Sequence, residues 1–218
     1  MTTTTSIHTI YKKADGTRVP SVTTYLGVLA KPALLQWAWE CGVAGLDYRK
    51  VRDQAGGIGS LVHYLILCRL KNEEPDLASY TPQDVAVAGT PMRKFDEWLK
   101  GHALEPILLE TPLVSELFNY GGTPDFYGSD NGKFTLLDFK TSGGIYEENF
   151  YQLAAYMMLL TEAGYSVESA RILRISKNED EGFDDRPGGN LELPWKIFLA
   201  CQQIYELQKA TRRKLRDV

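Results

Sequence analysis

The segments Gly121-Gly122-Thr123-Pro124-Asp125 and Thr135-Leu136-Leu137-Asp138-Phe139-Lys140 define the expected core of this 218-residue chain. Each segment ends in a charged residue, residues 123–128 and 133–139 around them are rich in strand-forming residues, and Asp130-Asn131-Gly132 is typical of a tight hairpin turn. Side chains alternate between the two faces of a strand, so Asp138 and Lys140 project to one side and Phe139 to the other. If the two strands are neighbours, two carboxylates and one ammonium converge near one point.

This convergence predicts a metal-dependent catalytic centre. Two carboxylates in close proximity repel each other, and a divalent cation that prefers oxygen ligands, Mg²⁺ or Mn²⁺, relieves the repulsion. Lys140 is then placed to orient or activate water against a phosphodiester. The alternative is that Asp125 is a turn residue and that Asp138 and Lys140 form an exposed pair. The apolar run from Phe134 to Leu137 argues against it, because charges that end a buried strand are hard to explain as solvated surface.

The pattern around these segments predicts further helices and strands. Helical periodicity, strand-forming residues and turn residues alternate from about residue 82 onward. The expected elements are a helix over 82–101 that breaks near 89–91, strands over 107–117, 123–128 and 133–139, a helix over 147–163, a strand over 168–176, a mobile acidic loop over 178–190 and a helix over 195–216.

The N-terminal part predicts a tail, a hairpin and helices. Ser21 is a suitable N-cap for a helix that ends near Gly27, and Pro32 suits the first turn of the next helix. The glycines of 56–60 are expected to precede a helix rather than to lie within one. The expected segments are a loose tail over 1–10, a hairpin over 11–19, helices over 21–27, 32–44 and 61–70, and a loop over 72–83.

The order helix, three strands, helix, strand predicts an α/β fold with a mixed central β-sheet flanked by helices. We expect a single nuclease domain over residues 1–218, with the catalytic core over 82–176. Residues 11–81 and 194–216 are then added N- and C-terminal helices around that core. No internal repeat and no linker divides the chain.

The composition fits a globular protein. Hydrophobic residues make up 44% of the chain and charged residues 24%, which is too apolar for disorder. The N-terminal threonine run does not resemble a signal peptide, and the apolar stretches fall short of the roughly 20 residues that span a membrane. The widely spaced Cys41, Cys68 and Cys201 are expected to be buried reduced thiols. We therefore expect no membrane partner and a cytoplasmic location, which is the host-cell cytoplasm if a phage encodes the protein.

The charge is distributed unevenly. A net charge of −4 argues against a general polyanion binder, although an acidic average can hide a basic groove. Basic residues gather early in the chain and at its C-terminus, and they either contact DNA phosphates or form two solvated faces. Those proposed for DNA contact are Arg49, Lys50, Arg52, Lys209, Arg212 and Arg213. The aromatic residues of the N-terminal region favour a polymer that can stack, although most buried aromatic residues simply belong to the core. They are Tyr11, Tyr25, Trp37, Trp39 and Tyr48.

Four motifs in order resemble the PD-(D/E)XK nuclease superfamily, in its RecB-type exonuclease branch. Pro124-Asp125 followed by Asp138-Phe139-Lys140 is similar to the motif that names the superfamily. Gln152 and Tyr156 resemble the Gln-x-x-x-Tyr motif of the branch, and the segment from Gly59 to His63 resembles its upstream Gly-x-x-x-His motif. Residues 19–23, with Lys31 and Trp37 after them, are similar to the N-terminal region of some members. The resemblance spans about residues 19–176.

The resemblance implies a restriction-endonuclease-like core and a role for each matched residue. Asp125 and Asp138 are expected to bind metal together with His63 and the backbone carbonyl of Phe139, while Lys140 positions the nucleophilic water. Four more residues complete the expected site: Gln152 and Tyr156, which contact DNA phosphate or brace the site, Thr141 as a DNA contact, and Glu116 as an outer metal ligand. The structural alternatives are a core histidine at 63, simple packing of Tyr156, and a surface position for Glu116.

The cofactors and partners follow from the same residues. One or two Mg²⁺ or Mn²⁺ ions are expected, without an iron–sulfur cluster, because three scattered cysteines do not supply four ligands. No phosphate-binding loop is present, so we expect no nucleotide, and a helicase or recombination partner is a separate protein. The expected substrate is DNA with a free end, because no dedicated element for reading base edges is visible. The expected role is DNA repair, recombination or phage DNA processing.

Other functions remain open at this point. A catalytically silent DNA-binding module, a structure-specific endonuclease and a metal hydrolase of small phosphoesters are each compatible with parts of the pattern. The intact Asp125, Asp138 and Lys140 argue against the silent module, and the aromatic and basic N-terminal region argues against a small phosphoester.

Overall fold

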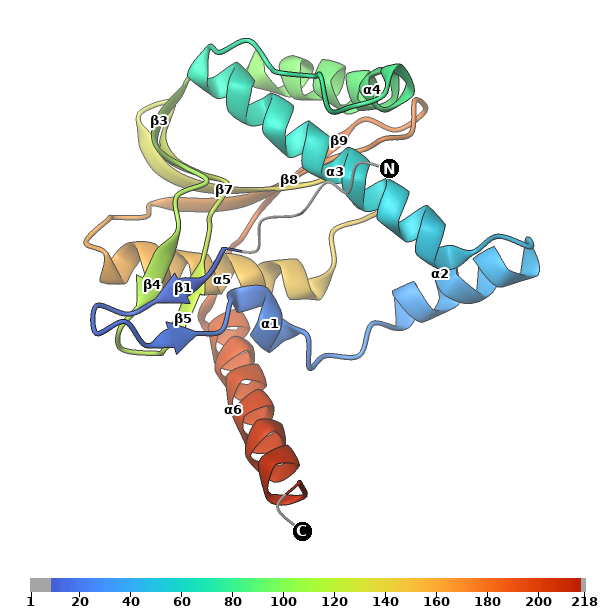
Figure 1. Ribbon diagram of the computed structural model, residues 1–218. Coiled ribbons are helices and arrows are strands. Elements are labelled where there is room, and N and C mark those ends of the chain that lie inside the picture. The colour runs from blue at the N-terminus through green and yellow to red at the C-terminus, as the bar shows by residue number, and fades with distance from the viewer. Residues whose placement is uncertain (1–8, 217–218) are drawn as a thin grey trace.

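The computed structural model describes residues 9–216 and is organised around a five-stranded mixed sheet (Figure 1). Neighbouring strands are antiparallel, except that β7 and β8 run parallel. In order across the sheet, the strands are β3 (Leu104–Leu109), β6 (Phe126–Asp130), β7 (Lys133–Lys140), β8 (Ser169–Ile175) and β9 (Phe183–Pro187). The central strand β7 is therefore paired with β6 as far as Leu137 and with β8 as far as Lys140.

The connections around β7 follow from local sequence. Asn131 and Gly132 have φ values of 51° and 83°, the left-handed conformation that a two-residue hairpin turn requires, which confirms the predicted turn between β6 and β7. The helix α5 (Glu147–Glu162) then connects β7 to β8, because two parallel strands need such a crossover. The predicted helix over 147–163 and strand over 168–176 are confirmed.

Helices cover both faces of the sheet (Figure 1). α5 lies against one face, and α3 (Tyr48–Lys71) and α4 (Pro82–Leu99) lie against the other. The alternation along β7 explains the two layers, because Leu136 packs with α5 whereas Leu137 and Phe139 pack with α3 and α4. By the same alternation, Asp138 and Lys140 lie on the α5 face. The mixed sheet flanked by helices confirms the predicted fold class.

The N-terminal elements begin where the sequence predicts. β1 (Tyr11–Lys12) and β2 (Arg18–Val19) form the expected hairpin. Ser21 accepts a hydrogen bond from the backbone N–H of Thr24 at 3.0 Å and caps α1 (Val22–Leu26). Pro32 begins α2 (Pro32–Val43), which projects from the body together with the first half of α3 (Figure 1). We call α2 and residues 48–60 of α3 the helical arm.

Two helices are longer or more continuous than predicted. α3 begins at Tyr48, after the N-cap Asp47, and passes through the glycines at 56, 57 and 59, where the sequence predicted a helix start. α4 continues through Pro91, where a break was predicted. Glycine and proline weaken a helix locally, but burial of an apolar face against the sheet stabilises the whole segment. The buried residues that hold these two helices are Ile58, Leu61, Val62, Ile66, Ala88, Phe95 and Trp98.

The predicted strand over 107–117 is wrong, because the chain changes sheets within it. β3 ends at Leu109, and β4 (Leu113–Ser115) pairs with β5 (Tyr120–Gly122) in a separate two-stranded sheet. Glu110 between them has a φ of 44°, in the left-handed region. Pro112 follows and lacks the N–H that a continuing strand would need. Together they form a corner that a pattern of strand-forming residues does not reveal.

The predicted mobile loop over 178–190 is also wrong, because it contains β9. Two of its acidic residues are partners of arginines on β8. Arg171 donates to Asp185 at 2.8 Å, and Arg174 donates to Glu181. The ladder between β8 and β9 and these ion pairs order the edge of the sheet.

The last helix, α6 (Glu192–Lys214), buries Phe198 and Cys201, while its C-terminal half extends beyond the body (Figure 1). Cys41, Cys68 and Cys201 are buried free thiols, as expected. Between residues 9 and 216, no helix is both long and apolar enough to cross a membrane. Residues 1–8 of the expected tail lie outside the described residues.

Candidate metal centre

His63, Glu110 and Asp125 meet from three elements. One potential ligand atom from each lies within 4.8 Å of the others, and His63 Nδ1 is 3.5 Å from Asp125 Oδ1. His63 comes from the middle of α3, Glu110 follows β3 directly, and Asp125 directly precedes β6. The sheet therefore fixes the two carboxylates, and α3 brings the imidazole to them.

Asp125 is anchored to the central strand. Its Oδ2 accepts a hydrogen bond from the backbone N–H of Phe139 at 2.7 Å, while Oδ1 is the oxygen that faces His63. The N–H and C=O of a residue in an antiparallel ladder point towards the same neighbouring strand. The Phe139 carbonyl is therefore expected to face the Asp125 side of β7, which is where the resemblance placed it.

Asp138 and Lys140 form a buried charge pair beside this group. Lys140 Nζ lies 2.6 Å from Asp138 Oδ2, and the Asp138 side chain is only 1% exposed. The Lys140 ammonium is therefore the charge partner of Asp138 Oδ2, although the contact falls short of a well-aligned hydrogen bond. A buried carboxylate is costly unless it is paired, and Lys140 offsets part of that cost here.

The pKa values of the two aspartates diverge. Burial and the nearby Asp125 charge raise the pKa of Asp138 to about 6, against the opposing effect of Lys140. Burial also acts to raise the pKa of Asp125, but His63 and Lys140 outweigh it and leave that pKa below its ordinary value. The two carboxylates thus compete for the positive charge of His63 and Lys140.

The two bases respond in the opposite sense to burial. Burial alone would lower the pKa of His63, but the Asp125 carboxylate more than compensates and raises it. Burial likewise opposes the charge on Lys140, and the carboxylates of Asp138 and Asp125 raise its pKa above the ordinary value. The centre is therefore a compact group of opposite charges in which each group depends on its neighbours.

Glu110 is a residue that the sequence reasoning missed, and it replaces Glu116 in the expected ligand set. Glu116 lies elsewhere, where its carboxylate accepts from the Ala14 N–H at 2.7 Å and is 3.7 Å from Lys13 Nζ. A signal was available, because Leu108-Leu109-Glu110 has the same form as Leu136-Leu137-Asp138, an apolar run that ends in an acid.

Gln152 and Tyr156 share one face of α5, as their spacing predicts. The Gln152 amide donates to the Tyr156 hydroxyl at 2.8 Å. Tyr156 is buried, and burial together with the charges of Asp138 and Asp125 raises its pKa well above the ordinary value. The pair therefore lies close to the carboxylates, in a position that suits bracing of the site. Its contact with DNA remains a prediction.

Gly59 and Thr141 explain why the upstream motif begins with glycine. A side-chain carbon added at Gly59 would lie 3.0 Å from Thr141 Oγ1. The glycine therefore lets α3 approach the end of β7, one helical turn before His63. Thr141, the predicted DNA contact, lies at this junction between the helix and the strand.

The basic residues proposed for DNA binding fall into two separate places. Arg49, Lys50 and Arg52 lie on the helical arm, where the Arg52 guanidinium pairs with Asp53 at 2.7 Å. Lys209, Arg212 and Arg213 lie on the half of α6 that extends from the body (Figure 1). The fold does not bring the two sets together, and their DNA contacts remain predictions.

The fold and the centre define a mixed α/β protein with three carboxylates, one imidazole and one ammonium at one end of its central strand. No family model matches the chain, and no curated protein matches it.

Two solved structures are similar in part. The chain is 16% identical to SSO0001, with a TM-score of 0.34, and the match covers 59% of this chain and 62% of SSO0001, less than two thirds of its length. It is also 16% identical to the alkaline exonuclease LHK-Exo from Laribacter hongkongensis, with a TM-score of 0.33, over 72% of this chain and 85% of that one. These likenesses are too slight to assign a function, so the assignment depends on the residues of the centre.

Proposed function

We propose that this chain is a metal-dependent nuclease of the PD-(D/E)XK type that hydrolyses phosphodiester bonds in DNA. One observation carries the proposal: His63, Glu110 and Asp125 meet beside the buried Asp138–Lys140 pair. A cluster of carboxylates with one imidazole suits a divalent cation, and an ammonium beside it suits an anionic substrate.

The residues present fit Mg²⁺ or Mn²⁺. His63, Glu110 and Asp125 would hold the ion, and Asp138 and the Phe139 carbonyl are the further oxygens of the proposed set. The burial of Asp138 beside the Asp125 charge is further support, because a cation would stabilise both carboxylates. When bound, such an ion supplies Lewis-acid polarisation of the phosphoryl oxygen and stabilises charge on the leaving oxygen.

The remaining residues position the reactants. Lys140, held by Asp138, would donate a hydrogen bond to the attacking water and so would orient it against the phosphodiester. Asp125 is fixed by the Phe139 N–H, which leaves its other oxygen directed at the centre. The hydrogen-bonded pair of Gln152 and Tyr156 would brace this arrangement from α5.

We further propose that the enzyme is an exonuclease that acts from a free DNA end in repair, recombination or phage DNA processing. The described residues form the sheet, its covering helices and the helical arm, and within residues 9–216 no separate module for reading base edges stands apart. Sequence-specific internal cleavage usually depends on such a module.

The test is digestion of end-labelled linear DNA and closed circular single-stranded DNA with Mg²⁺, with Mn²⁺ and with EDTA. Asp138→Asn serves as the matched variant. We expect metal-dependent degradation of linear DNA, little action on the circle and no activity in Asp138→Asn. A folded protein that cleaves neither substrate would be the silent DNA-binding alternative. Equal rates on circle and linear strand would make it an endonuclease.

A further inference from the structure

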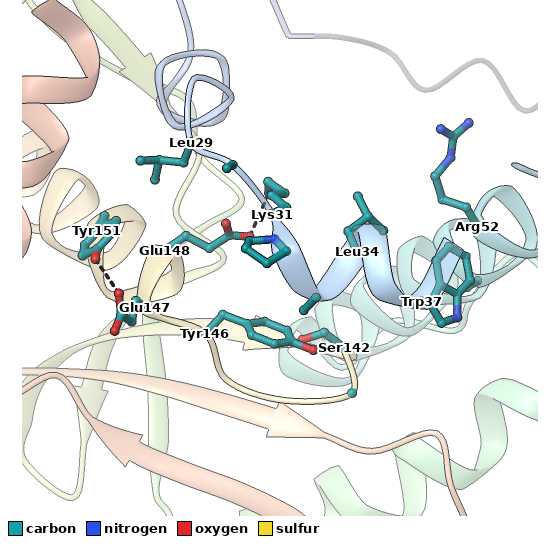
Figure 2. Close-up of a pocket in the computed structure, with 15 residues that line it drawn as sticks. Leu29, Lys31, Leu34, Trp37, Arg52, Ser142, Tyr146, Glu147, Glu148 and Tyr151 are labelled. Carbon is teal, nitrogen blue, oxygen red and sulfur yellow. Dashed lines mark hydrogen bonds and ion pairs between the residues drawn. The ribbon is translucent and has the colours of Figure 1, made fainter. Parts of the chain in front are cut away.

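A cavity of about 730 Å³ lies between the helical arm and the body (Figure 2). Its walls come from the start of α2, the first half of α3, the loop after β7 and the start of α5. Ser142 and Gly143 line it only a few residues after Lys140. The cavity is therefore adjacent to the proposed catalytic centre, and its size is within the roughly 300–1,000 Å³ of ligand pockets.

Two hydrogen bonds hold the loop that joins the cavity to β7. Arg174 on β8 donates to the Ser142 carbonyl at 3.0 Å, and the Ser142 hydroxyl donates to the Gly144 carbonyl at 2.8 Å. A group held in the cavity would therefore have a fixed position relative to Lys140 at the end of β7.

The charged side chains of the cavity already have partners. Lys31 Nζ lies 2.8 Å from Glu148 Oε1, and the Tyr151 hydroxyl donates to Glu147 at 3.0 Å (Figure 2). Arg52, the other charged lining residue, pairs with Asp53. With two cations and two carboxylates in its lining, the cavity presents no excess positive charge to a phosphate. A neutral group with polar edges suits it better.

Apolar and aromatic surfaces dominate the remaining lining. Trp37 and Leu34 face the cavity from α2, and Tyr146 faces it from the loop before α5 (Figure 2). Leu34 is 46% exposed and Tyr146 is 43% exposed, so neither side chain is buried in the core. Aromatic rings left accessible beside a nuclease centre are suited to stacking against bases.

We propose that this cavity binds an unpaired nucleobase of the DNA strand whose phosphodiester lies at the metal centre, with Trp37 and Tyr146 as the stacking surfaces. This inference rests on the proposed nuclease function and specifies that the substrate has an unpaired base near the cleaved phosphodiester. Bases in a duplex already stack on their neighbours, so the cavity selects a single strand or an unpaired end. The planar, neutral base meets the rings, and the polar groups at the rim meet its edges.

The test compares Trp37→Ala with Trp39→Ala. Both tryptophans lie on α2, but Trp39 does not line the cavity and is 63% exposed. The substrates are a single-stranded oligonucleotide and bis(p-nitrophenyl) phosphate, which is too small to engage both sites. We expect Trp37→Ala to raise the KM for the oligonucleotide roughly tenfold, since that is the scale of losing one stacked base. Trp39→Ala should leave that KM and the hydrolysis of the small phosphodiester unchanged.

Two further variants separate stacking from folding. Trp37→Phe keeps a ring and should recover most of the affinity, whereas Trp37→Leu keeps apolar volume and should behave like Trp37→Ala. Melting curves for all four variants show whether each is folded. Equal KM values for Trp37→Leu, Trp39→Ala and wild type would overturn the proposal.

A binding assay distinguishes failure of this proposal from failure of the nuclease assignment. Oligonucleotides with 2-aminopurine at successive positions report stacking by fluorescence and need no cleavage. A position-specific signal that Trp37→Leu removes would support the cavity even if wild-type protein cleaved no DNA. Cleavage by wild type with no Trp37-dependent signal at any position would overturn the cavity and retain the nuclease.

Discussion

Glu110 donates its backbone N–H to the carbonyl of Asp125 at 3.1 Å, so their side chains leave neighbouring strands next to each other. The pairing of Leu109 with Phe126 in the ladder between β3 and β6 sets this register. A one-residue slip of β3 against β6 would turn the Glu110 carboxylate away from Asp125 and His63. The metal centre is thus a product of strand pairing as much as of its residues.

The role of Glu110 is tested by comparing Glu110→Gln with Glu116→Gln. Loss of one charged ligand should weaken Mn²⁺ binding by roughly tenfold or more, which is the scale seen even for supporting residues around metals. Titration calorimetry and the Mn²⁺-dependent rise in melting temperature both report this loss. Glu116→Gln is the control, because Glu116 contacts Ala14 and Lys13 instead. Equal Mn²⁺ affinities in the two variants would contradict this role and identify Glu110 as a surface acid.

Lys140→Ala should lower kcat and leave DNA binding nearly intact. Its ammonium is proposed to orient water and to stabilise charge in the transition state, and removal of one such donor typically costs roughly 100- to 1,000-fold in rate. Single-turnover rates and dissociation constants, the latter measured with Ca²⁺ in place of Mg²⁺, separate the two effects. If affinity falls as much as rate, Lys140 is a phosphate contact rather than a positioning group.

Gly59→Val should disturb the centre through Thr141. The added side chain would meet Thr141 Oγ1, where even its first carbon lies at 3.0 Å, and would push α3 away from the end of β7. We expect lower metal affinity and lower kcat, because His63 lies on the same helix. Gly57→Ala is the matched control, because nothing lies within 4 Å of its added carbon. That control should gain up to about 1 kcal/mol of helix stability.

The C-terminal basic residues should matter only for long substrates. Lys209, Arg212 and Arg213 lie on the extended half of α6, so their replacement by Gln should spare cleavage of a short oligonucleotide. Binding of long single-stranded DNA should weaken, and the slope of log affinity against log salt should flatten by about 0.7 for each lost phosphate contact. An unchanged slope would identify these residues as a solvated helix end.

The segment between β8 and β9 should loosen in acid. Hydrogen bonds from Thr90 and Arg93 lower the pKa of Glu179, and those from Arg174, Ser176 and Asn178 lower that of Glu181. A lowered pKa means that these contacts stabilise the fold above the ordinary value of 4.5 and are lost as pH falls below it. Hydrogen exchange over 178–187, corrected for its intrinsic pH dependence, should show this loss. Glu181→Gln should reproduce part of it at neutral pH.

Local signals in the sequence predicted much of the fold. The Ser21 cap, Pro32 at a helix start and the Asn131-Gly132 turn each depend on residues a few positions apart, and all three were found. The segments that could not be predicted depend on distant partners. β9 exists because β8 offers it an edge and two arginines, which an acidic, glycine-rich composition does not show.

The residues of the candidate site also divide into those that local sequence predicts and those that depend on distant partners. Motif spacing predicted that Asp125, Asp138, Lys140 and His63 belong together, and the structure brings them to the same end of the sheet. Motif spacing did not predict Glu110. The interpretation of 107–117 as one strand hides the corner at which the chain leaves the main sheet. The choice between Glu110 and Glu116 was decided by that corner, which depends on the pairing of two separate sheets.

The left-handed backbone at Glu110 has a consequence for how this position can vary. Asn72, Asn119 and Asn131 are the other described residues besides glycine with positive φ, so asparagine serves where the chain only has to turn. Glycine or asparagine would fit the same corner with less strain, yet either would remove a negative charge from the centre. Aspartate would tolerate the backbone but end one methylene short of His63. In diverging copies of this chain, the residue at position 110 should therefore vary far less than its exposed position would permit.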